Sequence, residues 1–126
     1  MGGGRRTDGG QRTGKGGQRA AGRQYHIALG PGELAESILL CGDPDRAARV
    51  AALFDKVRLE RRHREYVTFT GEWNGQEVSV ISTGIGPDNT EIAVIEISQI
   101  CKRPTLVRIG SCGTLRDDIE IGDLII

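Results

Sequence analysis

An apolar run that breaks at a Gly-Asp-Pro turn and continues into a helical pattern constrains this chain most strongly. Residues 38–41, with the sequence ILLC, lead directly into Gly42-Asp43-Pro44-Asp45-Arg46. Glycine lets backbone amides approach a ligand closely, aspartate caps helices, and proline suits the first helical position. The run therefore predicts a buried strand that feeds a helix N-terminus. Free N–H groups there, with Arg46 nearby, form a ready anion site.

A second strand-like run ends in a similar way. Residues 105–109 carry Arg108 and lead into the turn Gly110-Ser111-Cys112-Gly113. Two strand ends that each bring one arginine predict a small oxyanion, such as phosphate, at the edge of a sheet. The alternatives are a solvated Arg46 on its helix, a structural ion pair for Arg108, and a Ser111 that only satisfies the turn backbone. An unpaired charge inside an apolar strand is costly, so Arg108 needs a partner of some kind.

The remaining pattern predicts an α/β domain with a mixed twisted sheet flanked by helices. Residues 64–72 alternate, with Tyr66, Thr68 and Thr70 on one face and Val67 and Phe69 on the other. The pair Asn74-Gly75 indicates a hairpin turn. Further strands are predicted at 38–42, 78–83, 105–109 and from 120 onward, and helices at 45–54 and 89–100.

Charge divides the chain into two parts. The whole chain has 17 basic and 17 acidic residues, but residues 1–23 hold six Arg or Lys and one Asp. Their Gly, Arg, Gln and Thr composition predicts a disordered tail, followed by one domain over 24–126. An arm that contacts nucleic-acid phosphates is the alternative to an extension without function. We favour the extension, and nucleic acid is not an expected partner.

Cysteine spacing and hydropathy argue against a disulfide-stabilised, zinc-binding, membrane-spanning or secreted protein. The cysteines at 41, 101 and 112 match neither a disulfide framework nor zinc-ligand spacing, and we expect Cys41 and Cys112 to be buried thiols. These features favour a cytoplasmic protein. No run approaches the about 20 apolar residues of a membrane span, and the basic N-terminus lacks the apolar region of a secretory signal. Because the chain ends within an apolar run, we expect it to be truncated.

Four motifs together resemble those of a known family. They are GDPDR at 42–46, HREY at 63–66, STGIG at 82–86 and RIGSCG at 108–113. In this order and spacing they resemble the nucleoside phosphorylases of the uridine phosphorylase and hexameric purine nucleoside phosphorylase type. The resemblance covers residues 25–126 and corresponds to the first half of a family member. It implies a pentosyltransferase that cleaves a nucleoside with inorganic phosphate as co-substrate, without metal or organic cofactor. It also implies a homodimer-based oligomer, a hexamer in the family, with no membrane partner.

The resemblance also implies roles for individual residues. Phosphate would be bound by Gly42, Arg46, Arg108 and Ser111, together with Arg64 from the neighbouring subunit. His26 would contact the ribose across the dimer interface. In some uridine phosphorylases a monovalent cation lies near the residue that matches Glu65. No catalytic residue is assigned, because the family's ribose clamp and base-recognition groups belong to its C-terminal half.

The base and the exact reaction stay open at this point. HREY and STGIG look like uridine phosphorylases, whereas RIGSCG looks like the purine enzymes; we favour the uridine type. A nucleosidase of the same fold would use water and would not need the two arginines. A non-catalytic remnant that binds anions or related subunits is the remaining alternative.

Overall fold

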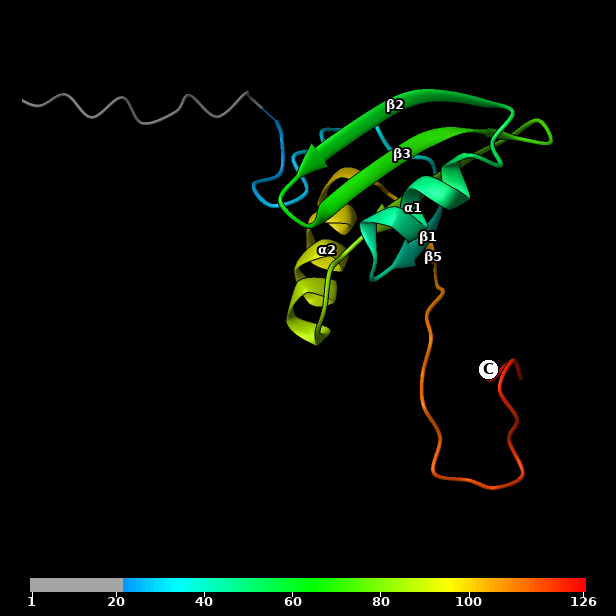
Figure 1. The fold of residues 1–126 in the computed structure, drawn as a ribbon. Coiled ribbons are helices and arrows are strands. Elements are labelled where there is room, and N and C mark those ends of the chain that lie inside the picture. Colours follow the sequence, from blue (N-terminus) through cyan, green and yellow to red (C-terminus); the bar gives the residue numbers. More distant parts are fainter. Residues whose placement is uncertain (1–21) are drawn as a thin grey trace, which may run out of the picture.

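The computed structural model describes residues 22–126, which form a five-stranded mixed sheet with a helix on each face (Figure 1). The strands are β1 (Ser37–Cys41), β2 (Lys56–His63), β3 (Tyr66–Trp73), β4 (Gln76–Ser82) and β5 (Thr105–Arg108). The helices are α1 (Pro44–Ala51) and α2 (Pro87–Ile100). Across the sheet the order is β2-β3-β4-β1-β5, with antiparallel pairs from β2 to β4 and parallel pairs on both sides of β1. The predicted mixed sheet is confirmed.

The parallel part of the sheet sets where the functional groups gather. β1 lies between β4 and β5 and runs parallel to both, so the carboxyl ends of all three strands meet at one edge. Cys41 is in register with Ser82 on β4, and Leu40 is in register with Arg108 on β5. The turns that follow these strands therefore lie next to one another, which is the usual place for a ligand in such sheets.

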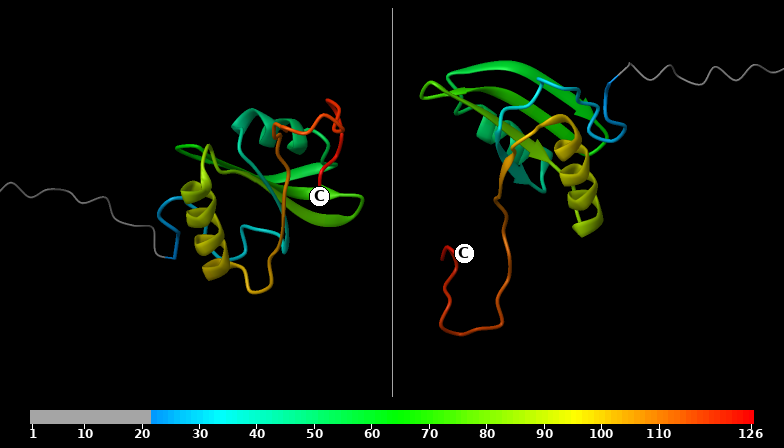
Figure 2. Two further views of the ribbon diagram at one scale, coloured as in Figure 1. Left: turned by 90° about the horizontal axis from the view of Figure 1, so that it is seen from below. Right: turned by 180° about the vertical axis from the view of Figure 1, so that it is seen from behind.

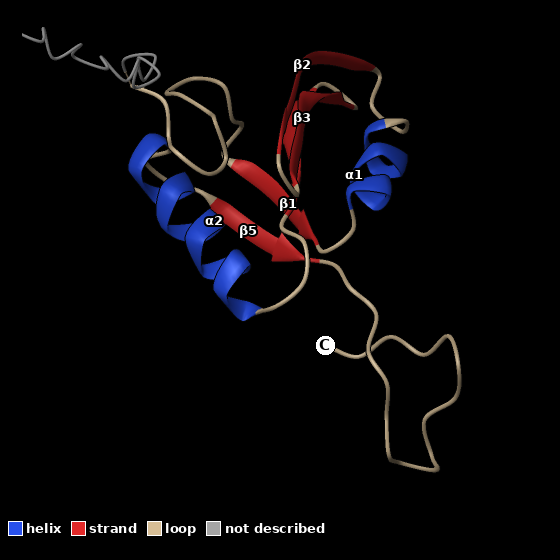
Figure 3. Cartoon of the chain, turned by 60° about the vertical axis from the view of Figure 1, so that its left-hand side comes forward, coloured by secondary structure: helices blue, strands red, loops and turns tan. Residues whose placement is uncertain are grey.

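The two helices lie on opposite faces of the sheet (Figure 3), and each face has its own apolar core. Ala93 and Ile97 of α2 pack with Leu40, Tyr66 and neighbours on one face. On the other face α1 packs on a second cluster, formed by Cys41, Ala47, Ala51, Val67, Phe69 and Val80. Tyr66 thus faces α2, while Val67 and Phe69 face α1, as the alternation in the sequence predicts. No helix among residues 22–126 is long and apolar enough to cross a membrane.

In the described part of the chain, one strand was missed and two expectations are wrong. β2 was not predicted, because its sequence KVRLERRH is highly charged; it is an edge strand that pairs only with β3. The predicted strand from 120 onward is wrong, since residues 109–126 hold no strand and extend away from the sheet (Figures 1 and 2). Cys112 lies in this segment and is exposed, whereas Cys41 is buried as predicted. An extended apolar run becomes a strand only where it can form hydrogen bonds with a neighbouring strand. Residues 120–126 lie beside no strand in the described part of the chain.

The predicted tail lies almost entirely outside the described residues, which begin at Gly22. Arg23, at the end of the predicted tail, makes two hydrogen bonds of 2.6 Å to the carboxylate of Glu33. This ion pair fixes the start of the described segment to the loop that precedes β1.

Candidate functional site

A cavity of about 750 Å³ opens at the sheet edge where β1, β4 and β5 end. Its lining residues come from the three turns that follow these strands, from both helix N-termini and from the β2–β3 turn. They are Gly42, Asp43, Pro44, Arg46, Glu65, Gly84, Ile85, Gly86, Asn89, Arg108, Gly110 and Ser111. Four of the residues predicted to bind phosphate, Gly42, Arg46, Arg108 and Ser111, therefore share one cavity.

The conformation of the turn after β1 follows from the residues of the turn itself. Asp43 has an extended backbone, and its Oδ1 accepts a 2.9 Å hydrogen bond from the backbone N–H of Asp45, which caps α1. Pro44 occupies the first helical turn, where no backbone donor is needed. This arrangement places Arg46 in the first turn of α1, so its charge adds to the positive end of the helix dipole.

The floor of the cavity is made of two backbone segments in close contact. Gly84 donates from its N–H to the carbonyl of Gly42 at 2.8 Å. Gly84 has φ +75°, and a Cβ there would lie 2.9 Å from Cγ of Glu65. A side chain at this position would therefore both strain the backbone and fill the cavity floor.

Glu65 and Asn89 form a polar pair at the same floor. Asn89 Nδ2 donates a 3.0 Å hydrogen bond to Glu65 Oε1. Among residues 22–126 no group of three or more His, Cys, Asp or Glu side chains is arranged to hold a metal ion. The pair adds one negative charge to a lining that otherwise carries two arginines and Asp43.

The two arginines of the cavity lack acidic partners. Neither Arg46 nor Arg108 forms an ion pair with any carboxylate of the described residues. Arg108 is exposed, and its Nη2 would lie 3.9 Å from a Cβ placed on Gly42. The structural ion pair considered for Arg108 is therefore absent, and its guanidinium is available to an anion.

Besides burial, the positive charges of Arg46 and Arg108 affect the pKa of the Cys41 thiol, which precedes Gly42 at the end of β1. Burial raises the pKa of the Cys41 thiol, and the positive charges of Arg46 and Arg108 partly oppose that effect. Both guanidinium groups thus act on the same small region at the end of β1. Two cations and a serine hydroxyl around one cavity suit a dianion.

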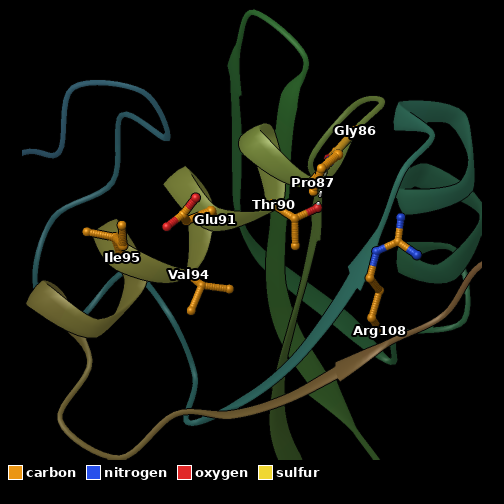
Figure 4. A pocket seen from close by; sticks show the side chains of 7 residues that line it. All are labelled: Gly86, Pro87, Thr90, Glu91, Val94, Ile95 and Arg108. Carbon is orange, nitrogen blue, oxygen red and sulfur yellow. Dashed lines mark hydrogen bonds between the residues drawn. The ribbon is translucent and has the colours of Figure 1, made fainter.

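A second hollow of about 850 Å³ adjoins the cavity and shares Gly86 and Arg108 with it (Figure 4). Arg108 and Ile95 lie at its opposite ends, with Thr90, Glu91 and Val94 placed along α2. Thr90 Oγ1 donates to the Gly86 carbonyl at 3.3 Å. The lining is mainly apolar, in contrast to the charged cavity beside it.

Two predicted site residues lie elsewhere. Arg64 is exposed in the turn between β2 and β3, with φ +55°, and its guanidinium lies 5.8 Å from the ring centroid of Tyr25. The same Tyr25 ring meets the imidazole of His26 edge-on, with centroids 4.9 Å apart. His26 and Arg64 thus cluster around Tyr25, and neither lines the cavity.

The structure adds one residue that the motifs do not reveal. Glu96 on α2 is 8% exposed and accepts hydrogen bonds from the backbone N–H groups of His26 and Ile27. Burial alone would raise the pKa of the Glu96 carboxyl, but the hydrogen bonds outweigh it and hold the pKa below its ordinary value. The available signal was one charged residue between apolar positions on the predicted helix.

Comparison with known proteins shows the superfamily of this chain. A family model described as the phosphorylase superfamily matches residues 36–126. The chain belongs to this superfamily. Uridine phosphorylase from Thermococcus kodakarensis is 48% identical over 109 residues, which is 86% of this chain and 39% of that protein. A DeoD-type purine nucleoside phosphorylase from Bacillus velezensis is 38% identical over 102 residues, 80% of this chain and 44% of that protein.

A solved structure agrees with the sequence matches. The crystal structure of uridine phosphorylase from Vibrio fischeri superimposes with a TM-score of 0.77 at 35% identity, covering 82% of this chain and 43% of that one. The resemblance to nucleoside phosphorylases that the motifs predicted is therefore confirmed. This chain spans about two-fifths of the length of these superfamily relatives.

Proposed function

We propose that this chain provides the phosphate-binding part of a nucleoside phosphorylase, a pentosyltransferase of the uridine type. The observation that carries the proposal is the shared cavity of Arg46 and Arg108, two arginines that form no ion pair with a carboxylate of residues 22–126 and lie where two neighbouring strands end. Gly42 and Ser111 line the same cavity and complete the donor set. Support for the reaction class comes from relatives named uridine phosphorylase and purine nucleoside phosphorylase.

In this proposal the chain holds inorganic phosphate as co-substrate and positions it for attack. A phosphate oxygen bonds to the anomeric carbon of the nucleoside, the glycosidic bond breaks, and the base leaves with the bonding electrons. The two guanidinium groups bind the dianion bidentately and fix its direction of attack. Neither a metal ion nor an organic cofactor takes part in this scheme.

His26 and Arg64 have a separate place in the proposal. Both lie at the Tyr25 cluster and outside the cavity of their own chain, which suits groups that reach the site of a neighbouring subunit. A homodimer-based oligomer would bring this cluster to the partner's cavity. The uridine preference rests on the HREY and STGIG motifs and on the 48% identity to a uridine phosphorylase.

The test is titration of the 126-residue chain with inorganic phosphate by isothermal calorimetry, comparing wild type with Arg108→Ala. A charged hydrogen-bonded pair is worth about 1.5–3 kcal/mol, so we expect phosphate affinity to fall roughly 10- to 100-fold. Arg103→Ala is the matched control, because Arg103 is an exposed arginine paired with Glu36 at 3.5 Å and is not part of the cavity. Equal phosphate affinity of wild type and Arg108→Ala would remove Arg108 from the site and contradict the proposal.

A further inference from the structure

The carboxylate of Glu96 makes an unusually complete set of contacts with a short segment far away in the sequence. Its Oε2 accepts the backbone N–H groups of His26 at 3.0 Å and Ile27 at 2.9 Å. Its Oε1 lies 2.7 Å from the imidazole Nδ1 of His26 and also 3.1 Å from the His26 backbone nitrogen. One side chain of α2 therefore holds both the backbone and the ring of His26.

These contacts fix where the imidazole proton lies. The hydrogen bonds to Glu96 hold the pKa of its carboxyl below the ordinary value, so the group is ionised at neutral pH. An ionised carboxylate accepts hydrogen bonds and donates none, so the facing Nδ1 must carry a proton. In a neutral imidazole Nε2 is then unprotonated and acts as an acceptor.

The other neighbours of His26 restrain its backbone and ring and form no hydrogen bond with Nε2. His63 Nδ1 lies 2.6 Å from the carbonyl oxygen of His26, which restrains the backbone, and the Tyr25 ring meets the imidazole edge-on. Nε2 makes no hydrogen bond to any residue in the described range 22–126, and the His26 side chain keeps 33% of its surface exposed. The ring is therefore oriented from within and open on its outer side.

We propose that Glu96 is a positioning residue that holds His26 as the Nδ1–H tautomer, so that Nε2 is presented as a hydrogen-bond acceptor for a hydroxyl group. The ligand class, a sugar hydroxyl, rests on the proposed function; the tautomer and the role of Glu96 rest on the contacts alone. A hydroxyl can donate to Nε2, whereas a fully deprotonated anion oxygen cannot. Glu96 therefore makes Nε2 of His26 an acceptor for a donor such as a hydroxyl, in contrast to the arginines of the cavity, which donate.

The replacement Glu96→Gln separates this role from a purely structural one. A glutamine has one acceptor oxygen, and placing it at the Oε2 position keeps the backbone hydrogen bonds of His26 and Ile27. Its NH₂ group then faces Nδ1 and donates to it, which requires an unprotonated Nδ1 and a protonated Nε2. The variant is thus expected to keep the segment in place and to reverse the tautomer.

The experiment is imidazole ¹⁵N NMR on the uniformly labelled 126-residue chain at about pH 8, above the ordinary histidine range. The chain has two histidines, so both rings can be assigned. We expect His26 to be the Nδ1–H tautomer in wild type and the Nε2–H tautomer in Glu96→Gln. His63 is an internal reference, because its Nδ1 faces a carbonyl oxygen and must stay protonated in both proteins. Glu91→Gln, an exposed glutamate on the same helix, is the matched control and should leave His26 unchanged.

Each outcome decides the proposal. A wild-type His26 that is Nε2–H, a mixture of tautomers, or protonated on both nitrogens at this pH overturns it, even where the variant does not fold. If the folded Glu96→Gln variant keeps the wild-type His26 tautomer, Glu96 only holds the segment in place. This result also overturns the proposal. Failure of the proposed function is recognised separately, because the calorimetric titration with phosphate does not depend on the His26 tautomer.

Discussion

At the scale of single residues, Gly71 on β3 is the described glycine at which an added Cβ would be most crowded. Gly71 pairs with Val57 of β2, and a Cβ at Gly71 would meet the backbone of Lys56 and lie 3.0 Å from Phe54 Cδ2. The partner strand is shifted in register between Val57 and Leu59, which indicates that β2 already bends at this point. No side chain fits here without moving the strand.

We therefore expect Gly71→Ala to destabilise the fold by about 1–3 kcal/mol, the usual cost of overpacking. The measurement is the guanidinium midpoint followed by circular dichroism. Gly113→Ala is the control, because a Cβ there meets nothing within 4 Å and the residue has no strained backbone. If both variants unfold at the wild-type midpoint, β2 does not pack against Gly71 as described.

At the scale of elements, two carboxylates hold the segment before β1 in place, Glu33 from within the segment and Glu96 from α2. Hydrogen bonds from Arg23 hold the pKa of the Glu33 carboxyl below its ordinary value. Glu96 on α2 is held low in the same direction by its hydrogen bonds to His26 and Ile27. The folded state therefore binds these protons more weakly than the unfolded chain does.

This difference predicts acid sensitivity with a definite sign. The stabilisation is complete above the unfolded glutamate pKa of about 4.3 and is lost as pH falls through the lower folded-state value. We expect the guanidinium midpoint of wild type to fall between about pH 6 and pH 3.5. The gap between wild type and Glu96→Gln should be largest at pH 6 and should narrow at pH 3.5.

The matched comparison for this pH series is again Glu91→Gln, because Glu91 is an exposed glutamate on the same helix, and the midpoint of this variant should parallel wild type throughout. A wild-type to Glu96→Gln gap that is constant with pH would show that Glu96 contributes by packing and not by its charge.

At the scale of the whole molecule, the segment after the β5 turn adds nothing to the lining of the cavity. Residues 112–126 lie in no helix or strand, are almost entirely exposed and are absent from that lining. Effective molarities worth several kcal/mol require both reactants to be held. We expect the 126-residue chain to bind phosphate without phosphorolytic turnover of uridine or inosine.

Base release measured with and without phosphate checks this expectation, with size-exclusion chromatography alongside. Exposed Leu115, Ile121 and Leu124 favour self-association of the chain. Phosphate-dependent turnover by a monodisperse preparation would mean that the 126-residue chain completes a nucleoside site by itself or with a second copy.

A second whole-molecule prediction concerns the Gly- and Arg-rich N-terminus. The contacts that fix the described segment begin at Arg23, with its ion pair to Glu33. Deletion of residues 2–22 should therefore leave the melting temperature unchanged within about 1–2 °C, far less than the shift from losing 1 kcal/mol in a small domain. A large drop would make the deleted residues structural. A salt-sensitive loss of RNA or DNA binding would instead support the nucleic-acid arm.

Most local elements and most of the candidate site groups could be predicted from short stretches of sequence. The Gly42-Asp43-Pro44 turn, the Asn74-Gly75 hairpin and the two faces of β3 follow from turn chemistry and a period of two, which are local properties. The family could be recognised because its four motifs lie at the turns that follow β1, β2, β4 and β5. The same reasoning missed β2 and wrongly predicted a strand from 120 onward, because strand formation depends on a pairing partner.

Which of these groups meet depends on the fold of the whole chain. Arg46 and Arg108 are 62 positions apart in the numbering, and they share a cavity because β1 and β5 are parallel neighbours whose ends coincide. His26 and Glu96 are 70 positions apart and meet because α2 packs beside the segment before β1. Long-range pairing is set by how two apolar faces are buried together, a property of the whole chain that no short motif contains.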